Sequence, residues 1–182
     1  KASPGGSIPL VKMYFTLASG TVLVAVTLRW LIKFALIVPG GSQSRPYKRI
    51  PKFVYEQIIE FLLKKKIKPI LIGSLADKKI CLQLSLISKE ILNLCTSTSI
   101  GQIFSLAKHS FLSVGNDTGP MHIIARANKK TLVFFTKFSD PTLCKPTGRN
   151  VEIFKYDNNN SDFFLTIKKS LQKCIWFYWL LT

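Results

Sequence analysis

The segment FLSVGNDTGPMH, residues 111–122, decides the fold of this chain. Its first residues form an apolar run that predicts a short buried strand, which the pair Gly115-Asn116 is expected to break. A helical pattern then runs over Met121–Ala127. Asp117 or Thr118 suits the N-cap of that helix, and Pro120 suits its first turn, where no N–H group is needed. A strand, a tight turn and a helix start with free N–H groups together predict a phosphate-binding site.

Strand-like and helix-like segments alternate along the rest of the chain. Short continuous apolar runs predict buried strands, and segments with apolar residues three and four positions apart predict helices. Such alternation predicts an α/β fold, with a Rossmann-like parallel sheet and helices on both faces. The predicted strands are Phe34–Val38, Pro69–Ile72, Ile91–Leu94, Phe111–Val114, Thr131–Phe135 and Val151–Phe154, and the predicted helices are Lys52–Lys65, Ala76–Ile87, Ile100–Ala107, Met121–Ala127 and Phe163–Gln172, with a loop at Ser139–Gly148.

Loops rich in small and polar residues follow the predicted strands. In a parallel sheet, ligands bind outside the carboxyl ends of the strands. We therefore expect these loops to form one ligand-binding edge, and they hold most of the Gly, Ser, Thr and Asp residues outside the helices. The loops are Pro39–Ser44, Gly73–Asp77, Cys95–Ser99, Gly115–His122 and Thr136–Pro141.

Three of these loops carry or lead into candidate ligand-binding residues. The hydroxyls of Ser42 and Ser44 can donate to phosphate oxygens, and Lys48 can supply a point charge. Asp77 follows the second strand of a βαβ unit, where a carboxylate can accept a hydrogen bond from a ribose hydroxyl. Thr118 and the N–H groups near Gly119 can hold a diphosphate.

Each of these features also has a plain structural explanation. The first loop can be an ordinary solvated turn, since it lacks the GxxxxGK[ST] spacing of a P-loop. Asp77 can simply stabilise the start of the helix that follows it. His122 lies one turn into its helix, below the phosphate site, and can equally be a hydrogen-bonded core residue. Asp117 suits a cap better than a base, because a carboxylate beside phosphates would repel them.

The nine acidic residues offer few candidates for a catalytic base. Only Asp77, Asp117 and Asp140 fall on the predicted ligand edge, and we expect none of them to pair with a histidine or a second carboxylate for general acid–base work. The sequence therefore predicts a binding site without a base of its own.

The composition favours anionic partners. The formal net charge of +17 fits nucleic acid, an anionic membrane or an anionic substrate. The basic residues fall in short clusters, for which a solvated helix end is the plain explanation, and no interleaved aromatic platform for RNA is visible, so we expect no nucleic-acid partner. The four cysteines lack CxxC spacing and the two histidines lack zinc spacing, which favours reduced thiols, no metal and a cytoplasmic location. Cys81 and Cys95 lie in apolar surroundings and are predicted to be core residues.

The amino-terminal segment Ile8–Phe34 is strongly apolar. Its uninterrupted part, Met13–Leu28, has about sixteen residues, which is short of the roughly 20 that a membrane-spanning helix needs. A weak membrane anchor and the remnant of a preceding segment are the two interpretations. We therefore expect a remnant or linker at residues 1–33, one domain at residues 34–160, and a carboxyl-terminal helix or tail at residues 161–182.

Four segments together carry a resemblance to a known family. They are FALIVPGGSQSRPYKRIP (34–51), PILIGSLADKK (69–79), FLSVGNDTGPMHIIA (111–125) and FSDPTLCKPTG (138–148). In this order and spacing the chain resembles the carboxyl-terminal domain of glycosyltransferase family 9, the ADP-heptose:lipopolysaccharide heptosyltransferases, over residues 34–154. The forms RPxKR…P and SDPxLCxPxG resemble the alphaproteobacterial branch.

The resemblance implies a fold and a set of roles. It implies the carboxyl-terminal half of a GT-B fold, in which two Rossmann-like domains face each other and this half binds the nucleotide-sugar donor. The implied donor is ADP-heptose or a related sugar nucleotide, and the implied acceptor is the lipid A core, met at the cytoplasmic face of the inner membrane. No cofactor or metal is implied, because basic side chains and the helix dipole stabilise the departing diphosphate. The implied donor-binding residues are Ser42, Ser44, Lys48, Asp117, Thr118, Gly119 and His122 around the diphosphate and sugar, with Asp77 at the ribose and with Lys48 and His122 as candidate leaving-group stabilisers.

The sequence departs from the family pattern in two places. Ile50 stands where the family usually has Trp, and nothing in Lys1–Lys33 matches the amino-terminal acceptor domain that carries the family's proposed catalytic Asp. The resemblance therefore implies no catalytic residue in this chain and predicts the donor-holding half of a transferase. The alternative is a catalytically inactive fragment that only binds nucleotide or nucleotide-sugar.

Overall fold

The computed structural model describes residues 11–13, 26–28, 33–157 and 162–180. In the amino-terminal part, two short strands, β1 (Val11–Met13) and β2 (Val26–Leu28), pair antiparallel. Most of the apolar segment Ile8–Phe34, with its predicted anchor or remnant, lies outside the described residues. The predicted division of the chain at residues 33 and 160 stays a prediction.

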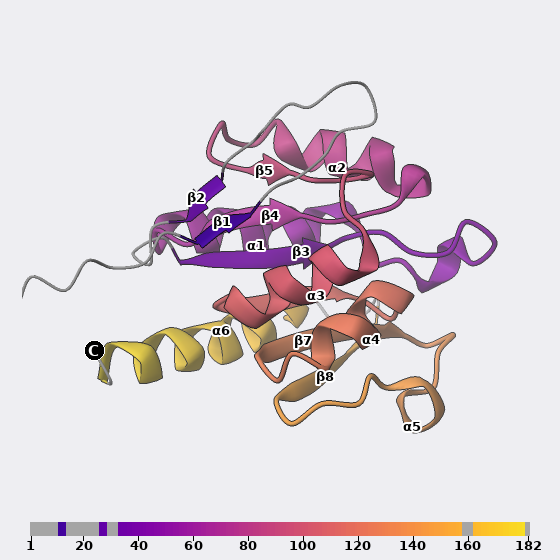
Figure 1. Ribbon diagram of the computed structural model, residues 1–182. Coiled ribbons are helices and arrows are strands. Elements are labelled where there is room, and N and C mark those ends of the chain that lie inside the picture. Colours follow the sequence, from indigo (N-terminus) through magenta and orange to yellow (C-terminus); the bar gives the residue numbers. More distant parts are fainter. Residues whose placement is uncertain (1–10, 14–25, 29–32, 158–161, 181–182) are drawn as a thin grey trace, which may run out of the picture.

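Six parallel strands form the main sheet among the described residues, in the order β5-β4-β3-β6-β7-β8. The chain enters this sheet in the middle, at β3, and runs outward through β4 and β5. It then returns to β6 beside β3 and continues outward through β7 and β8 (Figure 1). The strand order therefore reverses between β3 and β6, which is the point where open α/β sheets bind ligands. The strands are β3 (Phe34–Val38), β4 (Lys68–Leu71), β5 (Leu92–Asn93), β6 (Leu112–Asn116), β7 (Lys130–Thr136) and β8 (Val151–Tyr156).

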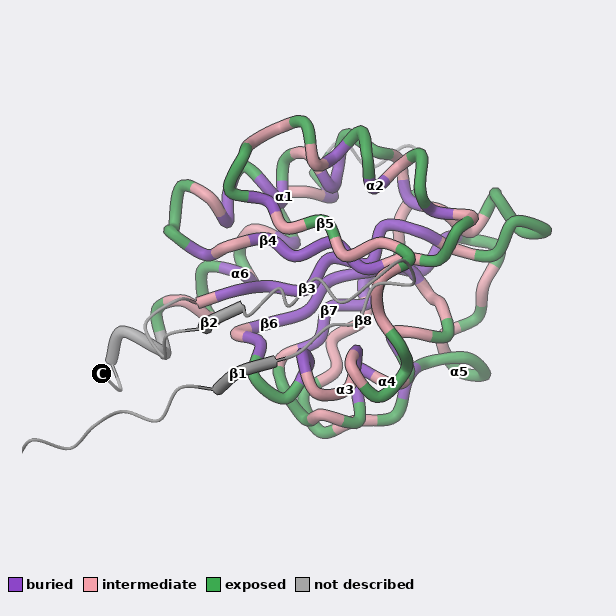
Figure 2. The backbone as a smooth tube through the Cα atoms, turned by 45° about the horizontal axis from the view of Figure 1, so that its top comes forward, coloured by how far each residue is buried: buried purple, intermediate pink, exposed green. Residues whose placement is uncertain are grey.

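Helices cover both faces of this sheet, as predicted. Alternate residues of β3 face opposite sides, and all of them are buried. Ala35 and Ile37 pack with α1, α2 and α6, whereas Phe34, Leu36 and Val38 pack with α3 and α4. Figure 2 shows the purple, buried strands between two layers of partly exposed helices. The helices are α1 (Lys52–Lys64), α2 (Lys78–Ser85), α3 (Ile100–His109), α4 (Gly119–Ala125), α5 (Pro141–Cys144) and α6 (Phe163–Leu180), with single turns η1 (Pro46–Lys48) and η2 (Leu75–Asp77).

The predicted break of the fourth strand at Gly115-Asn116 is wrong. Strand β6 continues through Asn116, because Gly115 pairs with Val38 of β3 and Asn116 pairs with Phe134 of β7. A side chain at position 115 would lie 2.7 Å from the Met121 sulfur and 2.8 Å from the Val38 carbonyl oxygen, so Gly115 serves the close approach of two strands rather than a turn. The turn comes at Asp117-Thr118, and α4 begins at Gly119.

Most other elements differ from their predicted bounds by one or two residues, and the largest differences lie in the loop after β7 and in α6. The predicted loop Ser139–Gly148 contains α5, capped by the Asp140 carboxylate, which accepts from the Thr142 N–H at 2.8 Å. Strand β5 is only two residues long, and α6 continues well past Gln172. Of the predicted core thiols, Cys81 is fully buried and Cys95 only half-buried. No helix among the described residues is long and apolar enough to cross a membrane.

Candidate functional site

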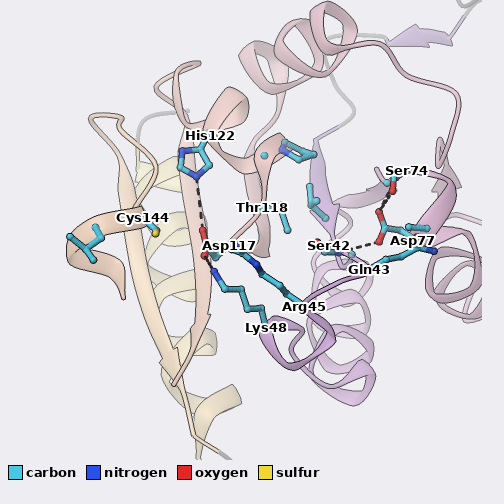
Figure 3. Close-up of a pocket in the computed structure, with 18 residues that line it drawn as sticks. Ser42, Gln43, Arg45, Lys48, Ser74, Asp77, Asp117, Thr118, His122 and Cys144 are labelled. Carbon is cyan, nitrogen blue, oxygen red and sulfur yellow. Dashed lines mark hydrogen bonds and ion pairs between the residues drawn. The ribbon is translucent and has the colours of Figure 1, made fainter. Parts of the chain in front are cut away.

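A cavity of about 710 Å³ opens at the carboxyl edge of the sheet, where β3 and β6 lie side by side. Its walls come from the loops after β3, β4 and β6 and from the starts of η2 and α4, and α5 closes one side (Figure 3). The lining residues are Val38, Gly40, Gly41, Ser42, Gln43, Arg45, Lys48, Gly73, Ser74, Ala76, Asp77, Asp117, Thr118, Gly119, Pro120, His122, Leu143 and Cys144.

Asn116 holds together two segments that line the cavity, the loop after β3 and the end of β6. Its buried amide nitrogen donates to the carbonyl oxygens of Pro39 and Gly40, both at 2.9 Å. Its amide oxygen accepts from the Tyr55 hydroxyl at 2.6 Å and from the Ile50 N–H at 3.3 Å. Burial raises the pKa of Tyr55 well above its ordinary value of 10.0, so the hydroxyl remains a donor. The loop after β3 is thereby tied to the end of β6 by a polar network that is fully bonded and therefore rigid.

Asp77 joins the loop after β3 to the loop after β4. Its carboxylate accepts from the N–H of Gly41 at 3.1 Å and from the N–H and hydroxyl of Ser74 at 2.9 and 2.7 Å. Arg49 lies 3.5 Å from the same carboxylate and donates to the Gly41 carbonyl oxygen at 2.6 Å. Position 40 tolerates no side chain, because a Cβ atom there would collide with the Asp77 carboxylate. The carboxylate borders the cavity, but protein donors already occupy both of its oxygens.

Lys48, Asp117 and Ser139 form a compact polar cluster at the other side of the cavity. The Lys48 ammonium donates to Asp117 Oδ2 at 3.3 Å and to the Ser139 hydroxyl at 3.0 Å, and Ser139 donates in turn to Asp117. His122 Nε2 lies 4.0 Å from Asp117 Oδ1 (Figure 3). This separation is longer than a hydrogen bond, so the expectation that no edge carboxylate pairs with a histidine for general acid–base work stays a prediction. The Asp117 side chain is only 7% exposed, so it holds the ammonium at a fixed position by the cavity.

The Thr118 hydroxyl is buried and has no hydrogen-bond partner within the described part of the chain. Thr118 is the N-cap residue of α4, but its side chain caps no N–H group of that helix. A buried hydroxyl without a partner costs about 1–3 kcal/mol. Because the residue lines the cavity, a polar ligand atom can supply the missing bond.

Most of the predicted site residues meet at this cavity. Ser42, Lys48, Asp77, Asp117, Thr118, Gly119 and His122 line it. Ser44 does not, and its hydroxyl is 2.8 Å from that of Ser42. The loop Cys95–Ser99 contributes no lining residue, and Thr136–Pro141 contributes only indirectly, through Ser139.

Sequence reasoning missed several residues that shape the site. Gln43 and Arg45 line the cavity, and Asn116, Arg49 and Ser139 hold its walls. Asn116 alone carried a signal, because a polar residue directly after a buried apolar run must find its own hydrogen bonds. No group of three His, Cys, Asp or Glu side chains that could hold a metal ion occurs in the described ranges.

The sequence and the fold of the chain are similar to those of one family of known proteins. Residues 23–174 match the model of glycosyltransferase family 9 (heptosyltransferase). Lipooligosaccharide heptosyltransferase 2 of Haemophilus ducreyi is 31% identical over 121 residues, which cover 63% of this chain and 35% of that protein. The fold is similar to E. coli ADP-heptose LPS heptosyltransferase II (TM-score 0.70, 19% identity, 79% of this chain and 46% of that one). It is also similar to E. coli heptosyltransferase WaaC with ADP (TM-score 0.68, 18% identity, 79% and 44%). The chain thus spans less than half the length of these relatives.

Proposed function

The chain belongs to glycosyltransferase family 9, and on that basis we propose that its Rossmann-like domain, residues 34–160, binds an ADP-sugar donor, ADP-heptose or a close relative. The transfer of that sugar to a lipopolysaccharide core is proposed for the whole protein. Two solved structures of similar fold support this donor. Both show E. coli heptosyltransferase WaaC, one with ADP and the other with ADP-2-deoxy-2-fluoro heptose.

The unpartnered Thr118 hydroxyl is the observation that carries the proposal. A diphosphate beside it would accept from this hydroxyl and from the N–H groups near Gly119, while Lys48 supplies the countercharge. The hydroxyls of Ser42 and Ser44 are proposed to donate to the same phosphates. Asp117, which would repel a phosphate on its own, is proposed to hold Lys48 in position and to face the sugar. Asp77 is proposed to lie at the ribose end.

The proposed mechanism needs only charge at the leaving group. As the bond from the sugar to the diphosphate breaks, negative charge grows on the departing oxygen, and Lys48 and His122 are proposed to stabilise it. No metal takes part in the proposed transfer. Protein cations already engage both carboxylates of the cavity, Asp77 and Asp117, so neither is proposed as the base. The base is proposed to come from outside the described residues. The acceptor is proposed to be the lipid A core, met at the cytoplasmic face of the inner membrane.

Calorimetry with ADP and ADP-heptose tests the donor site. We expect the full chain to bind ADP, and we expect Lys48→Ala and Thr118→Val each to weaken binding roughly 10- to 100-fold, since a hydrogen bond to a charged group contributes about 1.5–3 kcal/mol. Lys52→Ala is the matched control, because Lys52 pairs with Glu56 on α1 away from the cavity and its loss should leave the affinity unchanged.

Two outcomes would contradict the proposal. Unchanged ADP affinity in both site variants would show that the assigned residues do not hold the diphosphate. Sugar transfer to an acceptor by this chain alone would refute the assignment of the base to another part of the protein.

A further inference from the structure

Arg49 lies in the wall of the donor cavity, and part of its guanidinium is not used by the protein. One terminal nitrogen donates to the Gly41 carbonyl oxygen at 2.6 Å and lies 3.5 Å from the Asp77 carboxylate. The Nε atom is buried and has no hydrogen-bond partner in the part of the chain that the structure describes. Only one other buried side-chain nitrogen or oxygen of the described residues lacks a partner, and it is the Thr118 hydroxyl. An arginine that served only to hold the loop would be expected to have its buried N–H groups bonded.

The two unpartnered groups border the same space beside Gly41. A Cβ atom built on Gly41 would lie 3.7 Å from Arg49 Nε and 3.7 Å from the methyl carbon of Thr118. The backbone of Gly41 lies outside the left-handed region, and the atom nearest to such a Cβ, Arg49 Cγ, is 3.4 Å away, within the range of ordinary contact. The fold therefore does not require glycine at position 41, in contrast to position 40, where Asp77 leaves no room. A glycine without a structural reason is typical of a place where a ligand approaches the backbone closely.

This space lies between the two ends of the donor cavity. Figure 3 shows Asp77 at one end and Lys48 with Asp117 at the other, with Thr118 between them. Gly41 is joined to the first end, because its N–H donates to Asp77 at 3.1 Å. With the ribose at Asp77, as proposed above, the phosphate attached to the ribose comes next along the donor and lies beside Gly41. The second phosphate, which carries the sugar, then lies toward Lys48.

We propose that the phosphate attached to the ribose binds in the space beside Gly41 and that Arg49 is a further donor-binding residue. One phosphate oxygen accepts from Arg49 Nε on one side and from the Thr118 hydroxyl on the other. A guanidinium suits this place because its planar fork donates in several directions, so Arg49 can hold Gly41 and the phosphate together. Residues 42–47 beside the space are exposed, so a small shift of this loop admits the anion.

The inference rests on the proposed function and divides its diphosphate site into two subsites. Arg49 and Thr118 serve the phosphate at the ribose, and Lys48 serves the phosphate at the sugar. AMP carries only the first of these groups, ADP carries both and adenosine carries neither. The three compounds therefore separate the two subsites.

Binding of adenosine, AMP and ADP to the full chain tests this division, with ADP measured by calorimetry and the other two by displacement of ADP. Gly41→Ala places a methyl group in the space without a clash. We expect it to weaken AMP and ADP binding by the same factor, roughly 10- to 100-fold, which is the effect of losing a hydrogen bond to a charged group, and to leave adenosine unaffected. Gly101→Ala is the matched control, because a Cβ atom there meets nothing within 4 Å and the residue lies on α3. Its affinity for all three compounds should equal that of the wild type.

Substitutions of the two cations complete the test. Arg49→Gln should weaken AMP and ADP binding alike, and Arg49→Lys, which keeps the charge but not the planar fork, should give an intermediate loss. Lys48→Ala should weaken ADP binding much more than AMP binding. A merely structural Arg49 would act through a displaced Asp77 at the ribose, and its loss would weaken adenosine, AMP and ADP to the same extent.

Three outcomes would overturn the inference: wild-type AMP affinity in Gly41→Ala, a loss of adenosine binding in Arg49→Gln as large as the loss of AMP binding, or equal weakening of AMP by Arg49→Gln and Lys48→Ala. The proposed function would survive each of them, provided that Lys48→Ala and Thr118→Val still weaken ADP binding. A wild-type chain that does not bind ADP would contradict the proposed function itself. Gly41→Ala leaves Arg49 in place and decides the question even if Arg49→Gln fails to fold.

Discussion

Single polar residues, each bonded across a long stretch of sequence, give the donor cavity its shape. Asn116 reaches Pro39 and Gly40 on one side and Tyr55 on the other. Asp77 reaches back to Gly41. Each of these bonds joins the end of one strand to a loop that follows another, so the cavity walls are held by side chains rather than by the sheet alone.

Asn116→Ala should therefore destabilise the chain more than the small loss of side-chain volume suggests. The substitution leaves the Ile50 N–H and two carbonyl oxygens without their partner and the Tyr55 hydroxyl with only the Val38 carbonyl oxygen at 3.5 Å. We expect a loss of about 2–4 kcal/mol in the free energy of unfolding, measured by urea denaturation. Tyr55→Phe is the matched control, because it removes one bond of the same network, and it should cost about 1 kcal/mol. Equal losses in the two variants would mean that Asn116 does not organise the loop.

At this scale the sequence predicted the residues that a ligand would touch but not those that hold them. Ser42, Lys48, Asp77 and Thr118 carry their chemistry in their type and their place after a strand. The role of Ser139 depends on contacts with Lys48 and Asp117, which are 91 and 22 residues away, and no local pattern encodes contacts of that range.

A carboxylate on the outer strand adds a polar link between the sheet and helix α6, which also packs on the core through Phe163, Ile167 and Leu171. Glu152 on β8 accepts from the Lys130 ammonium at 2.6 Å and from the Ser170 hydroxyl on α6 at 2.5 Å. Partial burial acts to raise the pKa of Glu152, but the hydrogen bonds and charge of its neighbours outweigh it and hold the pKa below its ordinary value of 4.5. The ionised carboxylate is therefore the form that the folded chain favours.

Glu152→Gln should lower the free energy of unfolding at neutral pH but not in acid. Because the folded pKa is lowered, the contribution of Glu152 is fully present above pH 4.5 and is lost as the pH falls through the lower folded value. The group is about a third exposed, so solvent screening limits the difference to about 1 kcal/mol or less. Urea unfolding of wild type and variant at several pH values checks this, with Glu60→Gln as the exposed control. A difference that stays constant down to pH 3 would contradict it.

The existence and order of the six parallel strands and of the helices that connect most of them were predictable because the sheet is buried on both faces. Its strands read as continuous apolar runs, and helices of the expected period separate them, so the parallel α/β fold was predicted and is confirmed. The ends of elements were not predictable, since pairing decides them. Strand β6 extends through Asn116 because β7 continues beside it, and α5 arises where Asp140 caps a segment that reads as a proline-containing loop.

The whole molecule has two chemically different edges. The carboxyl edge carries glycines, hydroxyls and ion pairs around the donor cavity, whereas the amino edge gathers lysines, of which Lys130 is paired with Glu152. This separation follows from the topology. In a parallel sheet the carboxyl ends of the strands, where ligands bind, all lie at one edge. The carboxyl ends of the connecting helices, which favour cations, lie at the other edge. It was visible from the sequence only in outline, as a net charge of +17 with no single basic block.

That net charge should make the stability of the chain depend on ionic strength. At low salt the positive charges repel one another across the molecule, and the repulsion is strongest in the compact state. Sodium chloride shortens the screening length from about 30 Å at 0.01 M to about 8 Å at 0.15 M, so the melting temperature should rise over that range, by roughly 2–4 °C for each kcal/mol of repulsion removed. Scanning calorimetry of the wild type and of Lys48→Ala separates this effect from anion binding in the donor cavity. If screening is the cause, the melting temperature of both chains should rise equally. A rise confined to the wild type would indicate anion binding in the cavity, and a fall would contradict the repulsion argument.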